Sequence, residues 1–208
     1  MSIGGRLKII GRQVFPSGKA QVNVVGDRLS KGDVSAAGAF SGTWQDRLSG
    51  IADADCAFRD KTILDVGCSL GVIDYEISKY APKLVHGCDI HEASVEVARS
   101  IFLAVDVESN FWTLDLRDGD ALRQTVNRDY DIILCLAVDQ HVRKQIGDRA
   151  DDVMQYLLSR CTSTLLFRGT PNSESAVLDL ARNNGFEETY RGHASGSIAP
   201  LIRFDRTK

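Results

Sequence analysis

Short apolar runs alternate with amphipathic stretches along most of this 208-residue chain. An apolar run between turn signals predicts a buried strand, whereas apolar positions three and four residues apart predict a helix. From residue 61 onward there are seven strand-like runs, at 62–66, 84–89, 111–114, 130–136, 164–167, 186–190 and 198–204. Five helical stretches separate them, at 72–80, 91–105, 118–126, 142–161 and 175–184.

This alternation predicts an α/β domain with a doubly wound, seven-stranded, mostly parallel sheet and helices on both faces. The run at 130–136 is nearly all apolar, as expected of a strand that is buried on both sides. No helix separates the last two strands, so we expect an antiparallel C-terminal hairpin at one edge of the sheet. Gly185 is expected to end the helix that precedes this hairpin.

The first 55 residues differ from the rest of the chain. They are rich in Gly, Ser and Ala and contain only one short β-like run, at 21–25. Trp44, Leu48 and Ile51 are spaced as in a short amphipathic helix. We therefore divide the chain into an N-terminal arm or cap segment at 1–55 and one α/β domain at 56–208.

Composition narrows the classes of function. The net charge is −3 and the pI is about 5.8, so there is no overall basic field to attract nucleic acid. Nucleic acid is thereby disfavoured as a partner, although a local basic patch is not excluded. No apolar run approaches the about 20 residues of a membrane-spanning helix. The five cysteines form no Cys-x-x-Cys pair, which favours a reduced, metal-free, cytoplasmic protein.

A glycine turn follows the first strand of the domain. Asp65 lies near the end of that strand, and Gly67 and Gly71 leave the backbone of the turn bare. The spacing differs from the Gly-x-Gly-x-x-Gly pattern that admits a pyrophosphate at a helix N-terminus. An acid beside the turn would repel a diphosphate and attract a cation such as an amino-acid ammonium group.

Two further acids end the next two strands. Asp89 lies about 20 residues beyond the glycines, where an acid can accept hydrogen bonds from ribose hydroxyls. Asp115 could accept a hydrogen bond from an adenine amino group, with Leu116 packed on the ring. Taken in order, the three acids match the ammonium, the ribose and the adenine of S-adenosylmethionine, whose sulfonium also favours an acidic pocket.

At these residues the chain resembles the class I S-adenosylmethionine-dependent methyltransferases. The acid-x-Gly-x-Gly-x-Gly pattern of that family stands here as Asp65-Val-Gly67-Cys-Ser69-Leu-Gly71, with serine at the middle glycine. The resemblance implies that Asp65, Gly67 and Gly71 hold the methionine part, Asp89 the ribose and Asp115 the adenine. The full set of candidate cofactor-binding residues is Asp65, Gly67, Cys68, Ser69, Gly71, Asp89, Ile90, Asp115, Leu116 and Leu136.

The stretch after the fourth strand of the domain carries the candidate catalytic residues. Methyl transfer is an in-line displacement, and an oxygen nucleophile also needs a base to remove its proton. His141 is the candidate base, with Asp139 as its orienting group or as the base itself; a capping or core histidine is the equal alternative. Only Asn172 follows the fifth strand as an oxygen ligand, so we expect no metal site.

The predicted function is transfer of a methyl group to an oxygen of a small-molecule, sugar or lipid or polyketide-type acceptor. Three alternatives remain open. One is a methyltransferase for a modified wobble uridine of RNA, and a second is a non-catalytic scaffold of the same fold, which Ser69 in place of glycine keeps in view. A nicotinamide-dependent oxidoreductase is more remote because of the glycine spacing.

Overall fold

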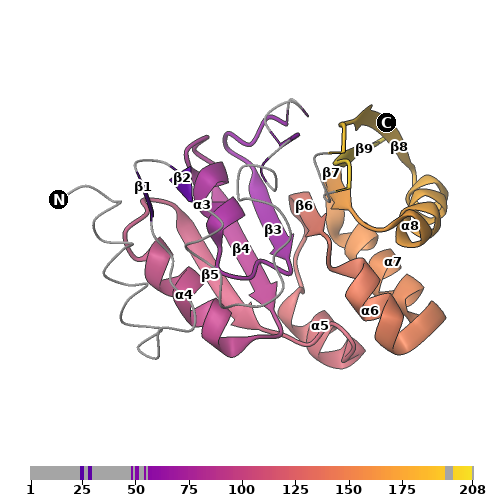
Figure 1. The fold of residues 1–208 in the computed structure, drawn as a ribbon, viewed down its shortest axis with the longest axis horizontal. Coiled ribbons are helices and arrows are strands. Elements are labelled where there is room, and N and C mark those ends of the chain that lie inside the picture. Colours follow the sequence, from indigo (N-terminus) through magenta and orange to yellow (C-terminus); the bar gives the residue numbers. More distant parts are fainter. Residues whose placement is uncertain are drawn as a thin grey trace.

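The protein is described by a computed structural model at residues 24–25, 28–29, 48, 50–51, 54, 56–194 and 199–207. A seven-stranded sheet in the order β5-β4-β3-β6-β7-β9-β8 forms its centre (Figure 1). The five strands from β5 to β7 are parallel, and β9 runs antiparallel to both of its neighbours. The bounds are β3 Thr62–Val66, β4 Leu84–Asp89, β5 Glu108–Thr113, β6 Tyr130–Leu136, β7 Cys161–Arg168, β8 Phe186–Arg191 and β9 Ile202–Arg206.

Helices cover both faces of the sheet, which confirms the predicted fold class (Figure 1). On one face α3 and α4 pack on the sheet, and on the other α5, α6, α7 and α8 do so. Their bounds are α3 Val72–Ser78, α4 Glu92–Phe102, α5 Gly119–Thr125, α6 Asp139–Ile146, α7 Ala150–Arg160 and α8 Pro171–Asn183, with a 3₁₀ turn at Gly147–Arg149.

The side chains of β6 show why a continuous apolar run makes a central strand. Ile132 and Leu134 belong to the core beneath α3 and α4, while Ile133 and Cys135 belong to the core beneath α5 to α8. Successive residues of a strand point to opposite faces, so each core receives every second side chain. All four side chains are buried.

Several elements differ from the predictions in their bounds, and two of these differences have a clear structural cause. The helix expected at 142–161 is divided at Gly147, whose φ of 59° and ψ of −135° lie in a region that is essentially restricted to glycine. The strand expected at 111–114 begins earlier, at Glu108, because the polar residues at its start lie on an edge strand and pair with β4. Gly185 has a φ of 77° and follows α8, as expected.

Part of the predicted N-terminal segment lies within the domain core. Ile51 and Ala54 are only 4% and 2% exposed and belong to the same apolar cluster as Leu201. Arg203 of β9 donates a hydrogen bond to the carbonyl of Ala54 over 2.7 Å. Trp44 lies outside the described residues, and the boundary at residue 55 stays a prediction.

Near the chain start, two short strands form a separate antiparallel pair, β1 (Val24–Val25) with β2 (Arg28–Leu29). Of the run expected at 21–25, Val24 and Val25 form β1, and residues 21–23 lie outside the described part of the chain.

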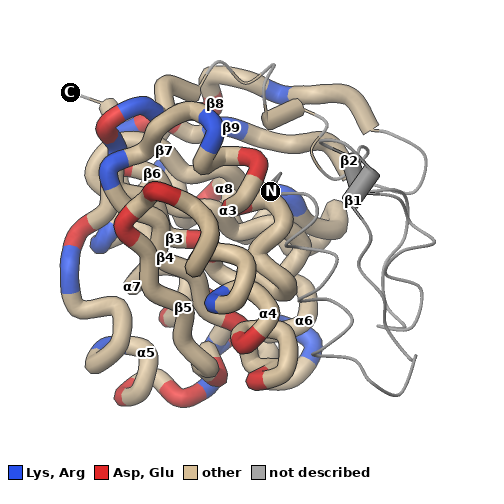
Figure 2. The backbone as a smooth tube through the Cα atoms, turned by 90° about the vertical axis from the view of Figure 1, so that its left-hand side faces the viewer, with Lys and Arg blue, Asp and Glu red and all other residues tan. Residues whose placement is uncertain are grey.

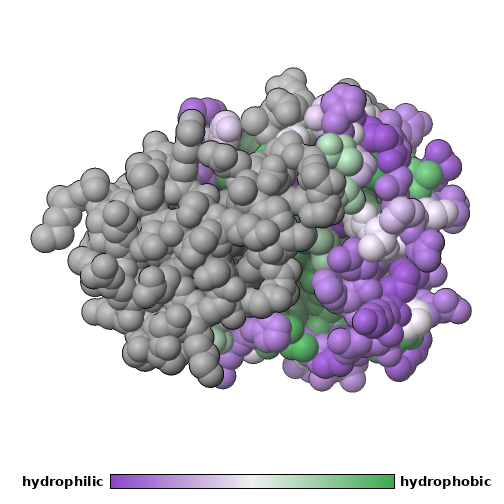
Figure 3. Space-filling model, viewed as in Figure 1, coloured by the Kyte–Doolittle hydropathy of each residue, from purple (hydrophilic) through white to green (hydrophobic). Residues whose placement is uncertain are grey.

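Charged residues of both signs are spread along the described part of the chain. Acidic and basic positions lie interspersed along the described backbone in Figure 2. Hydrophilic residues dominate the visible surface on the side of α6, α7 and α8 in Figure 3. Every helix among the described residues is too short or too polar to span a membrane.

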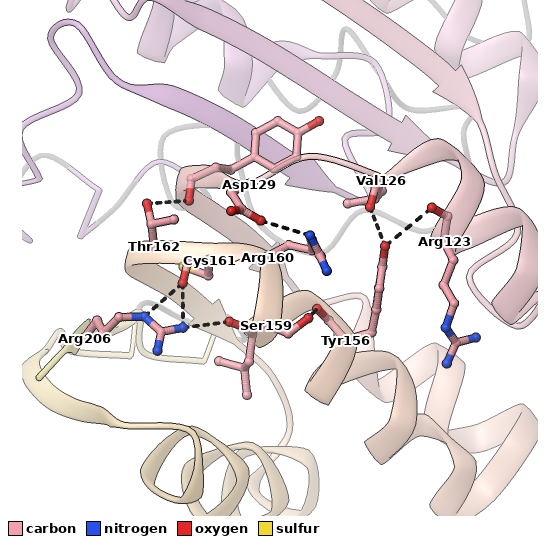
Figure 4. A network of polar contacts seen from close by, with 11 residues as sticks. Arg123, Val126, Asp129, Tyr156, Ser159, Arg160, Cys161, Thr162 and Arg206 are labelled. Atoms are coloured by element: carbon pink, nitrogen blue, oxygen red, sulfur yellow. Dashed lines mark hydrogen bonds and ion pairs between the residues drawn. The ribbon is translucent and has the colours of Figure 1, made fainter.

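A polar network joins the end of the chain to α7 at the amino ends of β6 and β7 (Figure 4). Arg206 donates to the carbonyls of Leu158 and Cys161 over 3.1 and 2.8 Å, and its guanidinium lies 4.4 Å from the centroid of the Phe186 ring. Tyr156 donates to the carbonyl of Val126 over 2.6 Å. The network lies at the amino ends of the strands, whereas the glycine turn lies at their carboxyl ends. Its contacts hold β9 against α7.

We therefore expect Arg206→Ala to lower the free energy of unfolding by about 1–2 kcal/mol, because it leaves the last carbonyls of α7 without their cation and removes a cation–π contact. Urea unfolding measures the change. Arg182→Ala is the matched control, since Arg182 is 62% exposed and meets Asp179 only at 4.0 Å; it should change stability by less than about 0.5 kcal/mol. Equal effects of the two variants would contradict a structural role for the network.

Candidate functional site

The site lies where the strand order of the sheet reverses. β3 is flanked by β4 on one side and β6 on the other, so the turns that leave these strands diverge and open a crevice. The backbone N–H groups of Gly67 and Cys68 both donate to the carbonyl of Cys88, over 2.8 and 3.0 Å. The glycine turn is thereby anchored to the end of β4.

Both glycines of the turn are required by conformation and by space. Gly67 has a φ of 83°, and a Cβ there would lie 2.7 Å from Val138 Cγ2 in the loop after β6. Gly71 has a φ of 70°, and its Cβ would lie 2.8 Å from the Cβ of Ala98 on α4. Positive φ is costly for other residues. Side chains are therefore absent at these two positions because neighbouring elements contact the backbone of the turn.

Ser69 takes the place of the family's middle glycine without a change in the path of the turn. Its φ is 50°, a left-handed conformation that costs a non-glycine residue about 1–2 kcal/mol. Its N–H donates to Asp89 Oδ2 over 3.0 Å. The serine at this position thus keeps the conformation and the backbone donor that a glycine would supply.

Asp89 is held rigidly at the end of β4. Its Oδ1 accepts a hydrogen bond from the N–H of His91 over 2.9 Å, and its Oδ2 accepts the bond from Ser69. Each carboxylate oxygen has a second lone pair, so the group can still accept hydrogen bonds from a ligand. The aspartate is preorganised to receive hydroxyl donors.

A pocket of about 470 Å³, including its open mouth, lies beside Asp89. Ile90, which is 48% exposed, and the leucines Leu114 and Leu116 after β5 give the pocket apolar contacts suited to a flat ring. Its lining residues are Gly67, Cys88, Asp89, Ile90, Leu114, Asp115, Leu116, Arg117, Val138, His141, Val142 and Gln145.

Asp115 and Arg117, which both line the pocket, form an ion pair. Arg117 Nε donates to Asp115 Oδ1 over 2.8 Å and its Nη2 to Oδ2 over 2.6 Å, and these bonds hold the pKa of Asp115 below its usual value. Arg117 also contacts the side-chain oxygen of Gln145 on α6. Sequence reasoning missed Arg117 and Gln145, because the contact joins residues 28 positions apart.

Asp65 has a second acid beside it that the sequence analysis did not select. Asp65 is 2% exposed, and Asp74 in the first turn of α3 is 0% exposed with no hydrogen-bond partner for either oxygen. Burial raises the pKa of Asp65 to about 7, with Asp74 and Asp89 as its other influences. Burial and the charge of Asp65 raise the pKa of Asp74 well above its usual value. An acid on the buried face of a predicted helix was the available signal.

The structure brings only part of the predicted site into the pocket wall. Gly67, Asp89, Ile90, Asp115, Leu116 and His141 line it. Asp65, Cys68, Ser69, Gly71, Leu136 and Asp139 lie outside that wall. Cys68 is 5% exposed and packs into the core beneath α3 and α4, and burial raises the pKa of its thiol well above the usual value. Leu136 packs against the same core.

The two candidate catalytic residues lie in different surroundings on α6. His141 is exposed and lines the pocket. Asp139 is 4% exposed, and its Oδ2 accepts a hydrogen bond from Arg143 Nε over 3.2 Å. Arg143 also pairs with Asp151 at 2.7 Å. The Asp139 carboxylate is thus directed to Arg143, one helical turn away, rather than to His141.

Within the described ranges, no group of three His, Cys, Asp or Glu side chains is arranged to hold a metal ion.

A sequence model of the methyltransferase small domain matches residues 34–150, which is more than half of the chain. The chain belongs to this family. With its glycine turn, its acids at successive strand ends and its sheet order, this methyltransferase domain is a member of the class I S-adenosylmethionine-dependent superfamily, as its resemblance implied.

Curated relatives of this methyltransferase domain differ in their acceptors. A ubiquinone biosynthesis O-methyltransferase from Hydrogenovibrio crunogenus is 33% identical over 86 residues, which cover 41% of this chain and 34% of that protein. A ribosomal protein L11 methyltransferase from Fusobacterium nucleatum is 26% identical over 131 residues, 62% of this chain and 39% of that protein. The matched regions thus span little more than a third of each relative.

Solved structures share the fold. The magnesium protoporphyrin IX methyltransferase of Synechocystis PCC 6803 with bound S-adenosylmethionine superposes with a TM-score of 0.61 at 23% identity, covering 76% of this chain and 74% of that chain. A putative RNA methyltransferase of Pyrococcus horikoshii gives a TM-score of 0.60 at 14% identity, covering 99% and 97%. These likenesses confirm the predicted architecture.

The residues of this methyltransferase domain fit S-adenosylmethionine. Both oxygens of Asp74 are buried without a partner beside Asp65, which is the surrounding that a cationic ammonium group would compensate. Asp89 offers oriented acceptors for hydroxyls, and the pocket beside it is largely apolar. A pyrophosphate carrier would meet three acids here and would be repelled.

Gly67→Ala should destabilise the domain by about 2 kcal/mol and weaken cofactor binding, because the new Cβ meets Val138 and the residue must keep a positive φ. Urea unfolding and titration with S-adenosylhomocysteine measure the two effects. Ser69→Gly is the control: it keeps both the conformation and the N–H donor to Asp89, so it should shift stability by less than about 1 kcal/mol. A Gly67→Ala variant as stable as wild type would show that the turn is not constrained by Val138.

Proposed function

We propose that the protein is an S-adenosylmethionine-dependent methyltransferase that methylates an oxygen of a small-molecule, sugar or lipid or polyketide-type acceptor by in-line transfer. The observation that carries the proposal is the placement of Asp65, Asp89 and Asp115 at the carboxyl ends of three adjacent strands, with Asp65 before the glycine turn and the other two in the wall of one pocket. The family membership of the chain supports the same chemistry.

Each acid has a distinct task in this proposal. Asp89 accepts hydrogen bonds from the ribose hydroxyls, for which its carboxylate is already oriented by two backbone donors. Ile90 and Leu116 supply apolar contact for the adenine, and Asp115 accepts from its amino group while Arg117 fixes the carboxylate. Asp65 attracts the ammonium group. When bound, the cofactor supplies an activated methyl group on sulfur.

Two observations favour an oxygen acceptor of small size. Two curated relatives at 33% and 32% identity are named ubiquinone biosynthesis O-methyltransferases. Acidic and basic positions are interspersed along the described backbone (Figure 2), whereas RNA binding depends on many basic side chains gathered to contact phosphates. The relatives that act on ribosomal protein L11 or are named for RNA make protein and RNA acceptors the alternatives to be tested.

His141 is the residue we propose as the base. Its imidazole is exposed in the pocket wall, whereas Asp139 is buried and paired with Arg143. Asp139 therefore acts by fixing the first turn of α6, on which His141 stands, and not by contact with the imidazole.

Calorimetric titration tests the cofactor assignment. S-adenosylhomocysteine should bind with a dissociation constant on the order of micromolar, a value ordinary for small ligands of this size, while NAD should give no signal. Asp89→Asn should weaken S-adenosylhomocysteine at least about tenfold, because it loses a charge-assisted acceptor. Asp106→Asn, at an exposed turn before β5, is the control and should bind as wild type does. Binding of NAD in place of S-adenosylhomocysteine would refute the proposal.

A second experiment concerns the base. With an acceptor identified from a panel of phenols, sugars, peptides and RNA, His141→Ala should lower kcat about 100-fold or more, because general-base catalysis contributes that much, and leave S-adenosylhomocysteine affinity within a few-fold of wild type. Lys144→Ala, on the exposed side of the same helix, serves as control. A loss of cofactor affinity with unchanged kcat would show that His141 contacts the nucleoside and does not act as the base.

A further inference from the structure

Asp65 and Asp74 form a buried pair of carboxyl groups, of which the family pattern includes only the first. That pattern has one acid before the glycine turn, and this chain adds a second from α3. Both side chains are almost entirely shielded from water, with 2% and 0% exposure. Asp65 stands two residues before Gly67, and Asp74 three residues after Gly71, so the two acids bracket the turn from a strand and from a helix.

Two ionised carboxylates cannot satisfy each other, because both are acceptors only. A single proton changes this: a protonated Asp74 can donate to an ionised Asp65. Burial raises the pKa of both carboxyl groups, and the contact between them lowers the pKa of Asp65 but raises that of Asp74 further, which agrees with this order.

Among the described residues, the groups that act on the pKa values of the pair carry no positive charge. The other groups that influence the two aspartates, or are influenced by them, are Asp89 and Cys88 from β4, Cys68 from the glycine turn and Cys135 from β6. The three thiols have pKa values raised by burial, so they stay neutral near pH 7. Among these groups, protons are therefore the means by which the free protein can offset the two carboxylates.

We propose that Asp65 and Asp74 share a proton in the free protein, that this proton passes to solvent when the α-ammonium group of the cofactor binds, and that Asp74 is thereby a second, positioning acid of the ammonium site. An ammonium group has three N–H donors, enough to bond to both carboxylates. The ammonium keeps its own protons, and the released proton is taken up by buffer. The inference rests on the cofactor half of the proposed function.

Calorimetry with two ligands separates the inference from that function. S-adenosylhomocysteine carries the ammonium group, whereas methylthioadenosine has the same nucleoside without it. Titrations at pH 7 in buffers of low and high ionisation enthalpy give the number of protons exchanged. We expect S-adenosylhomocysteine to release between about half a proton and one proton per site, and methylthioadenosine to release none.

The pH dependence follows with a definite sign. The pair must lose its shared proton before the ammonium can bind, so S-adenosylhomocysteine affinity should fall as the pH is lowered from 8 to 6, by up to about tenfold per pH unit. Methylthioadenosine affinity should stay flat. Asp74→Asn, which needs no proton to donate to Asp65, should release less proton and flatten the slope. Glu76→Gln, which alters a partly exposed acid on the same helix, should behave as wild type.

Unfolding of the free protein supplies a readout independent of the ligand. The folded-state pKa of Asp65 is raised from 3.8 to about 7, so the folded state binds more protons than the unfolded chain across that window. The free energy of unfolding should therefore carry a contribution that is present below pH about 4 and is lost as the pH rises to about 7. Asp74→Asn should reduce this loss, and Glu76→Gln should not.

Several results would overturn the inference. S-adenosylhomocysteine binding without proton release, or with the same release as methylthioadenosine, contradicts the shared proton while leaving the proposed function intact. Equal release in wild type and folded Asp74→Asn contradicts the role of Asp74. If that variant fails to fold, which circular dichroism shows, the comparison of the two ligands on wild type still decides. Failure of wild type to bind S-adenosylhomocysteine refutes the proposed function itself.

Discussion

The contact between the turn after β3 and the loop after β6 is the constraint on which the site depends. Val138 leaves no room for a side chain on Gly67. Two hydrogen bonds to the carbonyl of Cys88 fix the backbone of the glycine turn on its other side. The turn is therefore held from both neighbouring strands at the point where the sheet reverses its order. Ser69 can then adopt a left-handed conformation, because the surrounding structure determines it.

Fixing the turn also fixes the charges around it. The N–H of Ser69 orients Asp89, and the same turn separates Asp65 from Asp74 along the chain while bringing both into one buried space. On the side of the site near α6 the acid has a basic partner, because Arg117 pairs with Asp115 and also contacts Gln145. The crevice thus has an uncompensated acidic end and a neutralised end, which suits a ligand that is cationic at one end and a neutral ring at the other.

Strand and helix order could be predicted because both depend on local periodicity. The run at 130–136 needed only its apolar character, and the structure divides its side chains between the two cores. Bounds were less accurate where one residue decides them: Gly147 divides a helix that periodicity extends, because its ψ of −135° is outside the helical region. The polar start of β5 escaped prediction, since its strand character comes from pairing with β4.

In the site, the acids at the ends of three strands and the glycine turn could be read from the chain alone, because the carboxyl ends of parallel strands meet on one side of a sheet. Three contacts became known from the folded structure: Asp74 lies beside Asp65, Asp139 pairs with Arg143, and Arg117 reaches Gln145. The physical reason is that burial and pairing arise between elements that are brought together by packing, and the pKa of a carboxyl group depends on those neighbours and not on its position in the chain.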